Sequence, residues 1–130
     1  MSGFEIEILG DHTGCRYVDA ELKTACELAL TRAGIADGHL AIEFVDEARI
    51  RELNRRYRGV DEPTDVLSFG VDEDSPGAGP RELGDIVICC ARTADIRTAV
   101  LHGALHLAGM DHETDGGEML SLQDMLLKEQ

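Results

Sequence analysis

The chain has 130 residues, of which 43% are hydrophobic and 29% are charged, a composition typical of a soluble globular protein. Twelve Lys and Arg against 26 Asp and Glu give a net charge of −14, which argues against a protein that coats nucleic acid or an anionic membrane through bulk charge. No apolar run approaches the roughly 20 residues of a bilayer span, and the N-terminus lacks a secretory leader pattern. We therefore expect a cytoplasmic protein with a single domain over residues 1–130 that holds any anionic substrate at a local site.

The first elements in chain order are a strand, a helix and a second strand. Apolar residues alternate with glutamates over Phe4–Ile8, which is the period of a half-buried strand. Asp19 can cap the following helix, whose apolar stripe reaches Ala33 and which Gly34 can end in the left-handed conformation. A second strand is expected at about residues 40–45.

A second helix is predicted to begin after the cap residue Asp46 and to end near Gly59. Five arginines lie within its last ten residues: Arg49, Arg51, Arg55, Arg56 and Arg58. Glu47 and Glu52 are interleaved with them, so helical spacing favours a solvated, ion-paired surface for the group from Arg49 to Arg56. We expect three residues on the inner face of this helix: Ile50, Leu53 and Tyr57.

The second half of the chain predicts two further strands and two further helices. A short strand at 65–69 precedes a segment at 70–84 that is rich in acid, Gly and Pro and is expected to be a mobile loop. A continuous apolar run at 85–89 is typical of a strand covered on both faces. A mostly apolar, buried helix over about 93–108 and an amphipathic helix at 118–127 follow. The order β-α-β-α-β-β-α-α indicates an α+β fold with a small mixed β-sheet of about four strands packed with helices.

Three of the five histidines stand close together in the segment LHGALHLAGMDHE. His102 and His106 are four residues apart, so both imidazoles project from one face of the predicted buried helix. Gly109 can end that helix and turn the chain so that His112 returns toward the same point. Three neutral imidazoles that leave one position open describe a catalytic zinc site, in which a bound water is acidified to a pKa of about 7.

The other potential metal ligands are predicted to be structural. Cys89 and Cys90 are adjacent at the end of a strand, where their side chains point to opposite faces, and we interpret them as packing residues. Reduced thiols are expected because the chain has no C-x-x-C motif and no secretory signal. His12 and His39 stand beside Gly and Asp in turn-like contexts and are not predicted to be ligands.

The spacing H-x3-H-x2-G-x2-H is that of the metzincin peptidases, whose signature is H-E-x-x-H-x-x-G-x-x-H. Gly103 occupies the position of the glutamate that acts as general base in those enzymes. Glycine carries no proton acceptor, so the mechanism disfavours a peptidase.

Several segments together resemble the YbeY-type endoribonucleases, bacterial rRNA maturation factors with a zincin-like fold. The segment LNRRYRGVDEPTDVLSFG at 53–70 is similar to that family's L-N-x-x-Y-R-x-K-D-x-P-T-D-V-L-S-F-P. LGDIVIC at 83–89 resembles its L-G-D-I-x-I strand, and 101–113 resembles its H-G-x-L-H-L-x-G-Y-D-H-E signature. The resemblance covers residues 40–130, and the tail fits at Glu118, Met119 and Gln123.

The resemblance implies a zinc-dependent endoribonuclease that cuts single-stranded RNA in rRNA processing, at the 3′ end of small-subunit 16S rRNA, and in ribosome biogenesis. It places His102, His106 and His112 on the ligands of one Zn2+ per chain and Arg58 on the active-site arginine. The expected partners are single-stranded or ribosomal RNA and the small ribosomal subunit with its proteins, with no membrane and no DNA.

Two aspartates also match motif positions, and three features depart from the family pattern. For Asp111 a role in orienting a ligand histidine and a role in the turn after the helix both stay open, and Asp65 has no assigned role. The usual lysine is Val60, and the usual tyrosine before Asp-His is Met110. Only residues 91–101 separate the strand end from the first histidine, where the family has a longer stretch with a further helix.

Two alternatives to the endoribonuclease remain. One is a non-catalytic ribosome-assembly factor whose zinc is structural, which a fourth protein ligand would favour because closed tetrahedral sites are structural. The other is the small metallopeptidase, which the glycine at position 103 disfavours.

Overall fold

The computed structural model describes residues 3–10, 18–71 and 81–129. Within these ranges the chain forms, in order, β1 (Phe4–Gly10), α1 (Asp19–Arg32), β2 (Gly38–Val45), α2 (Glu47–Arg58), β3 (Val66–Gly70), β4 (Glu82–Cys89), a short 3-10 helix (Cys90–Arg92), α3 (Ile96–Leu107) and α4 (Glu118–Lys128). The predicted α+β class and the predicted order of elements are confirmed. None of the described helices has the length and apolarity needed to cross a bilayer.

The described strands form one mixed sheet in the order β1-β2-β4-β3. β1 pairs in parallel with β2, and β2 pairs in parallel with β4, whereas β3 lies antiparallel on the outer side of β4. The register places Ile42 opposite Ile86, and Ile88 opposite Val66. β4 is therefore a central strand, and β3 is an edge strand.

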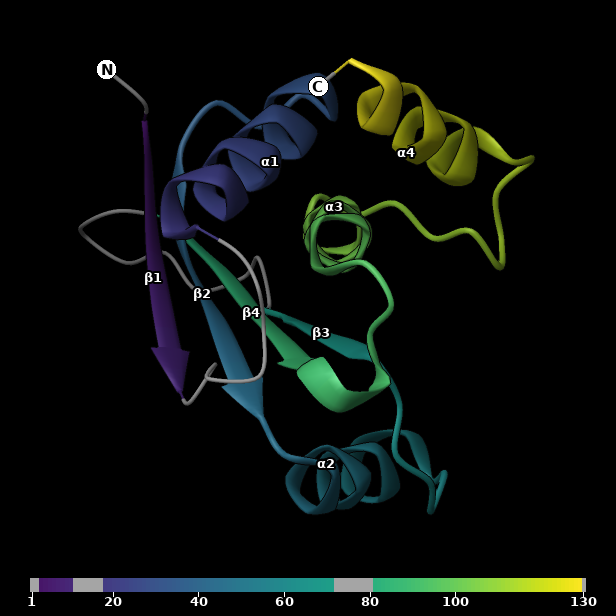
Figure 1. The fold of residues 1–130 in the computed structure, drawn as a ribbon. Coiled ribbons are helices and arrows are strands. Elements are labelled where there is room, and N and C mark those ends of the chain that lie inside the picture. The colour runs from purple at the N-terminus through teal and green to yellow at the C-terminus, as the bar shows by residue number, and fades with distance from the viewer. Residues whose placement is uncertain (1–2, 11–17, 72–80, 130) are drawn as a thin grey trace.

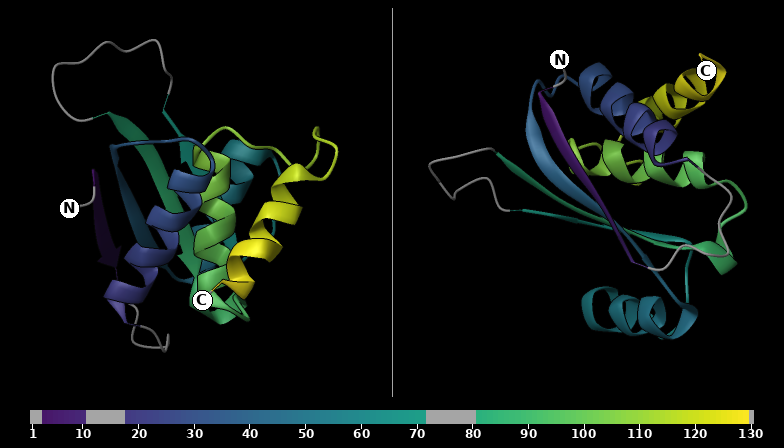
Figure 2. Two further views of the ribbon diagram at one scale, coloured as in Figure 1. Left: turned by 90° about the horizontal axis from the view of Figure 1, so that it is seen from above. Right: turned by 60° about the vertical axis from the view of Figure 1, so that its left-hand side comes forward.

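The helices cover the sheet unequally (Figure 1). Among the described helices, α1, α3 and α4 pack over one face and α2 packs over the other, as the two further views also show (Figure 2). Ile86 and Ile88 of β4 point into the larger core, whereas Val87 and Cys89 point into the smaller cluster under α2. This alternation confirms that the 85–89 strand is covered on both faces.

The helix ends agree with capping chemistry at α2 and differ from the prediction at α1. The Asp46 carboxylate accepts a hydrogen bond from the backbone N–H of Arg49 (2.8 Å), and Gly59 ends α2 with a φ of 72°, as predicted. At α1 the cap residue is Val18, with no side-chain cap hydrogen bond. Asp19 is instead the first helical residue, where its charge favours the positive end of the helix dipole.

Helix α3 begins at Ile96, three residues later than predicted. The carboxylate of Asp95 accepts a hydrogen bond from the backbone N–H of Arg97 (3.1 Å) and caps the helix there. Thr93 instead lies in the connection, where its hydroxyl donates to the carbonyl of Cys89 (2.6 Å). The apolar character of the segment is confirmed by its burial, since Ala99, Val100, Leu101, Gly103, Ala104 and Leu105 are all buried.

The interpretation of residues 70–84 as one loop is wrong at both ends. Gly70 ends β3, and residues 82–84 begin β4, so the antiparallel pair is longer than predicted. Residues 72–80, to which the expectation of mobility mainly applied, lie outside the described residues.

The prediction that Tyr57 lies on the inner face of α2 is also wrong. Its side chain is 62% exposed, whereas Ile50 and Leu53 are buried as predicted. Tyr57 meets the edge strand β3 at Phe69, and among the described strands none lies beyond β3 to cover the ring.

The cysteines follow the prediction in part. Cys26 and Cys89 are free and buried, and burial raises the pKa of Cys26 to about 12, so this thiol is inert packing. Cys90, in contrast to the expectation of reduced thiols, is disulfide-bonded.

Helix α3 lies in close contact with the sheet at Gly103. A Cβ atom at this position would lie 2.7 Å from Cγ2 of Ile86 and 3.1 Å from the hydroxyl oxygen of Ser68. The Ser68 hydroxyl donates a hydrogen bond to the Gly103 carbonyl (3.3 Å). A residue without a side chain is therefore what allows α3 to lie directly on β3 and β4.

On the opposite face of the sheet, His39 connects three strands. Its Nδ1 lies 2.8 Å from a Glu82 carboxylate oxygen, and its Nε2 lies 3.1 Å from a Glu7 carboxylate oxygen. Hydrogen bonds to Glu7 and then to Glu82 raise the pKa of His39. These contacts give His39 a structural role. It lies within β2 and not in the turn-like context that we expected, and His12 lies outside the described residues.

We predict that His39 stabilises the fold at acid pH. Because its folded-state pKa is raised, its contribution is fully present below the unfolded pKa of about 6.5 and is lost as pH rises through the folded value. His39→Gln should lower the melting temperature more at about pH 5.5 than at about pH 8.5. Lys128→Gln, which removes an ion pair to Asp124, is the control. It should change the melting temperature by a similar amount at both pH values. An equal effect of His39→Gln at the two pH values would refute the linkage.

Candidate metal centre and groove

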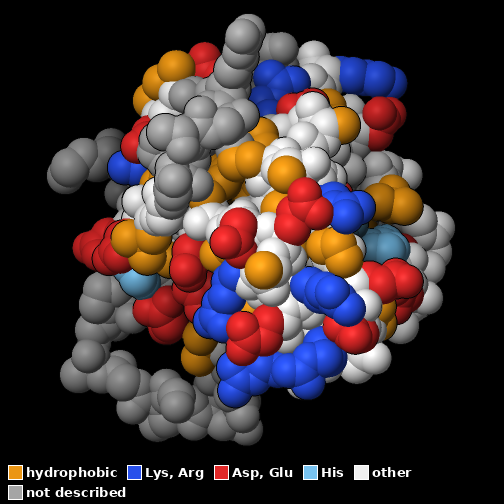
Figure 3. Space-filling model, turned by 60° about the horizontal axis from the view of Figure 1, so that its bottom comes forward, with side chains coloured by type: hydrophobic (Ala, Val, Ile, Leu, Met, Phe, Trp, Pro, Cys, Tyr) orange, Lys and Arg blue, Asp and Glu red, His pale blue; other side chains and the backbone are white. Residues whose placement is uncertain are grey.

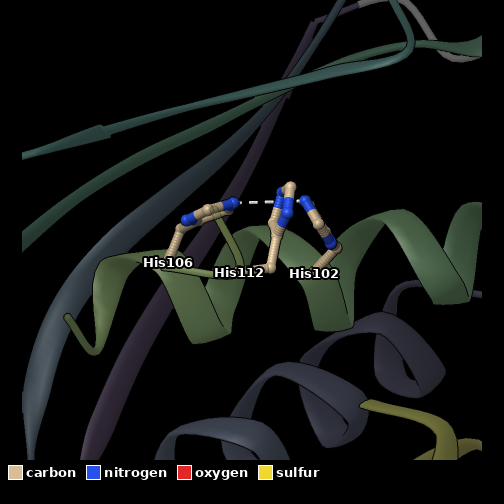
Figure 4. A group of neighbouring side chains, drawn as sticks. All are labelled: His102, His106 and His112. Carbon is tan, nitrogen blue, oxygen red and sulfur yellow. Dashed lines mark hydrogen bonds between the residues drawn. The ribbon is translucent and has the colours of Figure 1, made fainter. Parts of the chain in front are cut away.

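The three clustered histidines converge as predicted (Figure 4). His102 and His106 lie one turn apart on α3, and His112 returns from the loop that follows Gly109, whose φ is 96°. The ring centroids are separated by 4.7 Å, 5.1 Å and 5.3 Å. One ligand nitrogen from each ring lies within 4.8 Å of the others, an arrangement that could hold a metal ion.

The hydrogen-bond partners of the two helical histidines determine which ring nitrogen faces the centre. The Nδ1–H of His102 donates to the side-chain oxygen of Gln123 (2.8 Å), and the Nδ1–H of His106 donates to the backbone carbonyl of Met110 (3.0 Å). Both partners are oxygen acceptors, so each neutral ring keeps its proton on Nδ1 and presents the lone pair of Nε2. This is the usual way in which proteins orient metal-binding imidazoles.

The distance between the two inward nitrogens fits a tetrahedral metal ion. Nε2 of His102 and Nε2 of His106 lie 3.2 Å apart, the contact dashed in Figure 4. Two lone pairs at this distance repel each other unless a cation lies between them. Zinc–nitrogen bonds of about 2.0–2.1 Å in a tetrahedron place ligand nitrogens about 3.3 Å apart. The donor set and its spacing therefore suit zinc.

The surroundings of His106 favour the protonation state that binds metal. Burial lowers the pKa of His106, and the neighbouring His102 lowers it further. A lowered pKa keeps the imidazole neutral near pH 7, which is the form that can bind a metal ion.

The three histidines line one wall of an open groove with a volume of about 930 Å3. Tyr57 and Arg58 at the end of α2, residues 66–70 of β3, and residues 109–113 after α3 also line it. The groove thus brings together the three predicted metal ligands and the predicted catalytic arginine, from segments that are far apart in the sequence.

The side chain of Arg58 is exposed and available to a ligand. The C-terminal carbonyls of α2 at Arg55 and Asn54 are satisfied by the backbone N–H groups of Gly59 (3.1 Å) and Val60 (3.3 Å). Within the part of the chain that the structure describes, Arg58 has no ion-pair or side-chain hydrogen-bond partner. The guanidinium of Arg58 is therefore not needed as a hydrogen-bond donor to the last carbonyls of α2.

Other arginines of α2 are paired with carboxylates, and basic and acidic side chains are intermixed on the face of the molecule seen in Figure 3. Arg49 and Arg56 pair with Glu52 across one helical turn, as predicted. Arg51 pairs with Asp61 and holds the pKa of that carboxyl below its usual value. Glu47, which we also expected to pair within the helix, instead pairs with Arg92.

The two aspartates that matched motif positions have structural contacts. The Asp111 carboxylate accepts from the backbone N–H of Glu113 (3.0 Å), which supports its role in the turn. The Asp65 carboxylate accepts from the backbone N–H of Val66 (2.8 Å) at the start of β3. Orientation of His102 falls to Gln123, whose role the sequence did not reveal, because 21 residues separate the pair.

The peptidase alternative finds no support at position 103. Gly103 faces Ile86 and Ser68 of the sheet, where even a Cβ atom would be too close. A glutamate there could not be accommodated without moving α3. The site thus combines three histidines that could hold a metal ion with the absence, at position 103, of the glutamate base of the peptidases.

Comparison with known proteins identifies the family. A family model described as Endoribonuclease YbeY matches residues 12–130, so this chain belongs to the YbeY endoribonuclease family. The match begins well before residue 40, where the resemblance in the sequence motifs began.

Individual relatives agree with this assignment. The chain is 38% identical to an Endoribonuclease YbeY from Bacillus cytotoxicus, with 82% of each chain covered. It is also 38% identical to one from Staphylococcus aureus, with 90% of each covered. The solution structure of TM1509 from Thermotoga maritima is similar with a TM-score of 0.55 and 32% identity, over 96% of this chain and 88% of that one.

The hydrogen bond to His102 predicts a graded effect on metal affinity. His106→Ala should abolish tight binding, because two imidazoles remain. Gln123→Ala should weaken binding by about 10- to 100-fold, the usual effect of losing a partner that orients a ligand. Gln123→Glu, which keeps an acceptor at the same place, should recover most of the affinity.

Competition titration with a zinc chelator measures these affinities, and Asp124→Ala on the same helix is the matched control. Gln123→Ala with the affinity of the wild type would show that the contact does not orient the ligand.

Proposed function

We propose that this chain is a zinc-dependent endoribonuclease that cuts single-stranded RNA in 16S rRNA 3′ maturation and ribosome biogenesis. In this proposal His102, His106 and His112 hold one Zn2+ per chain, and Arg58 binds the scissile phosphate. The observation that carries it is the shared groove, which is lined by the exposed guanidinium of Arg58 and by three converging imidazoles.

The chain's own residues bind and orient the substrate. Zinc, when bound, supplies Lewis-acid chemistry toward a phosphoryl oxygen or a water molecule. Arg58 is suited to the phosphate because its planar guanidinium can donate two parallel hydrogen bonds to two oxygens. Arg58 ends α2 and lines the same groove as the histidines, so an RNA strand bound in this groove would meet both.

The proposed partners are single-stranded or ribosomal RNA and the small ribosomal subunit with its proteins, in the cytoplasm. Support comes from the names of the relatives, which are endoribonucleases. A chain with a net charge of −14 must attract RNA locally rather than through its overall charge. Arg58 in the groove offers such a local attraction, whereas Arg49, Arg51 and Arg56 of the same helix are paired with carboxylates.

Arg58→Ala should separate RNA cleavage from metal binding. We expect zinc content and melting temperature to stay close to those of the wild type, and cleavage of single-stranded RNA to fall by about 10- to 1,000-fold. Arg58→Lys should recover part of the lost activity, because an ammonium keeps the positive charge but cannot donate two parallel hydrogen bonds from one plane. The measurement is kcat/KM on a short RNA, together with elemental analysis.

Arg49→Ala is the matched control, because Arg49 is an exposed arginine of the same helix that pairs with Glu52. Cleavage at the wild-type rate by Arg58→Ala would remove this arginine from the mechanism. Absence of cleavage by the zinc-loaded wild type would favour the non-catalytic assembly factor with a structural zinc.

A further inference from the structure

Tyr57 is an aromatic side chain that the fold leaves uncovered. It is 62% exposed, and it is the most exposed of the aromatic residues that the structure describes, since Phe44 is buried and Phe4 and Phe69 are half-buried. Tyrosine rings usually bury a large area and stabilise a fold by doing so. A ring that is mostly exposed at this position is therefore available for a ligand.

Two neighbouring side chains nevertheless hold the Tyr57 ring in place. The ring of Phe69 on β3 lies 5.1 Å away at an interplanar angle of 64°, a favourable edge-to-face contact. Phe69 itself packs against the small cluster under α2. The guanidinium of Arg56 lies over the Tyr57 ring, 5.9 Å from its centroid. These contacts restrict the ring, so a ligand that stacks on it loses little additional conformational entropy.

The Tyr57 ring also lies in the groove that contains the proposed phosphate-binding arginine and metal ligands. Tyr57 lines the same groove as Arg58 and the three histidines, and it precedes Arg58 directly in the last turn of α2. In a single strand of RNA, each phosphate is joined through a sugar to a base with an exposed π face. Proteins that bind single strands combine cationic side chains for the phosphates with aromatic rings for the bases.

We propose that Tyr57 stacks on an unpaired base of the RNA next to the phosphate that Arg58 binds. This inference rests on the proposed function and adds to it the residue that recognises the single-stranded state. Bases in a duplex are stacked on one another and cannot be reached by this ring. Tyr57 is thus a specificity-determining residue rather than part of the bond-breaking chemistry.

The kinetic test compares a ring with a non-aromatic side chain at position 57. Tyr57→Ala and Tyr57→Leu, which keeps much of the apolar volume, should raise KM for single-stranded RNA by about 5- to 150-fold, the usual effect of losing one stacked base. The change in kcat should be smaller. Tyr57→Phe keeps the π face and should restore KM. Leu120→Ala is the control, since Leu120 is an exposed apolar residue on α4.

An RNA substrate with one abasic site identifies the stacked base. The abasic site is moved along the strand, and KM is measured at each position. At one position the missing base should raise KM for the wild type. At that same position it should leave the KM of Tyr57→Ala unchanged, because this variant has already lost the stacking contact. This dependence would not arise if Tyr57 acted only through the stability of α2. Equal sensitivity of wild type and Tyr57→Ala at every position would overturn the stacking proposal.

A binding test is available because the chain contains no Trp. Tyr57→Trp introduces a single indole, whose fluorescence in the zinc-loaded protein should be quenched on mixing with single-stranded RNA, before cleavage proceeds, and not with polyphosphate. Normal cleavage by the wild type together with an unchanged KM in Tyr57→Ala and Tyr57→Leu would overturn the stacking proposal alone. Failure of the zinc-loaded wild type to bind and cut RNA would overturn the proposed function and this inference together.

Discussion

The close contact between α3 and the sheet at Gly103 is the constraint on which the candidate site depends. A side chain at this position would overlap Ile86, so the absence of one determines how near the helix lies to β3 and β4. His102 flanks this contact, and His106 lies one turn further along. The groove that these histidines and β3 line lies next to this contact, since Ser68 belongs to both. The same contact leaves no room for the glutamate that the peptidase signature has at this position.

The C-terminal helix α4 contributes to the metal centre through one side chain. Gln123 reaches from α4 to His102, while Met119 and Leu126 of the same helix are buried in the larger core. Packing of α4 thus positions the acceptor that determines the tautomer of His102. Metal binding and docking of this helix are consequently coupled, since each stabilises the arrangement that the other needs.

The sequence predicted those features that depend on local spacing. The histidine triad follows from positions within a single helix and its C-terminal turn, and the ends of α2 follow from Asp46 and Gly59. Features that depend on distant parts of the chain were not predictable. Helical periodicity placed Tyr57 on the inner face, but it carries no information about where the sheet ends. The partner of His102 comes from another helix, and the start of α3 depended on which of several polar residues would cap it.

The most direct test of the metal centre is X-ray absorption spectroscopy at the zinc edge of the purified protein. We expect three imidazole nitrogens at about 2.0–2.1 Å, identified by their multiple scattering, and one further light-atom ligand that is not an imidazole. Loss of the multiple-scattering signal of one imidazole in His112→Ala would assign the third ligand to the loop after Gly109. A sulfur ligand, or a closed shell of four protein ligands, would contradict an open three-histidine site.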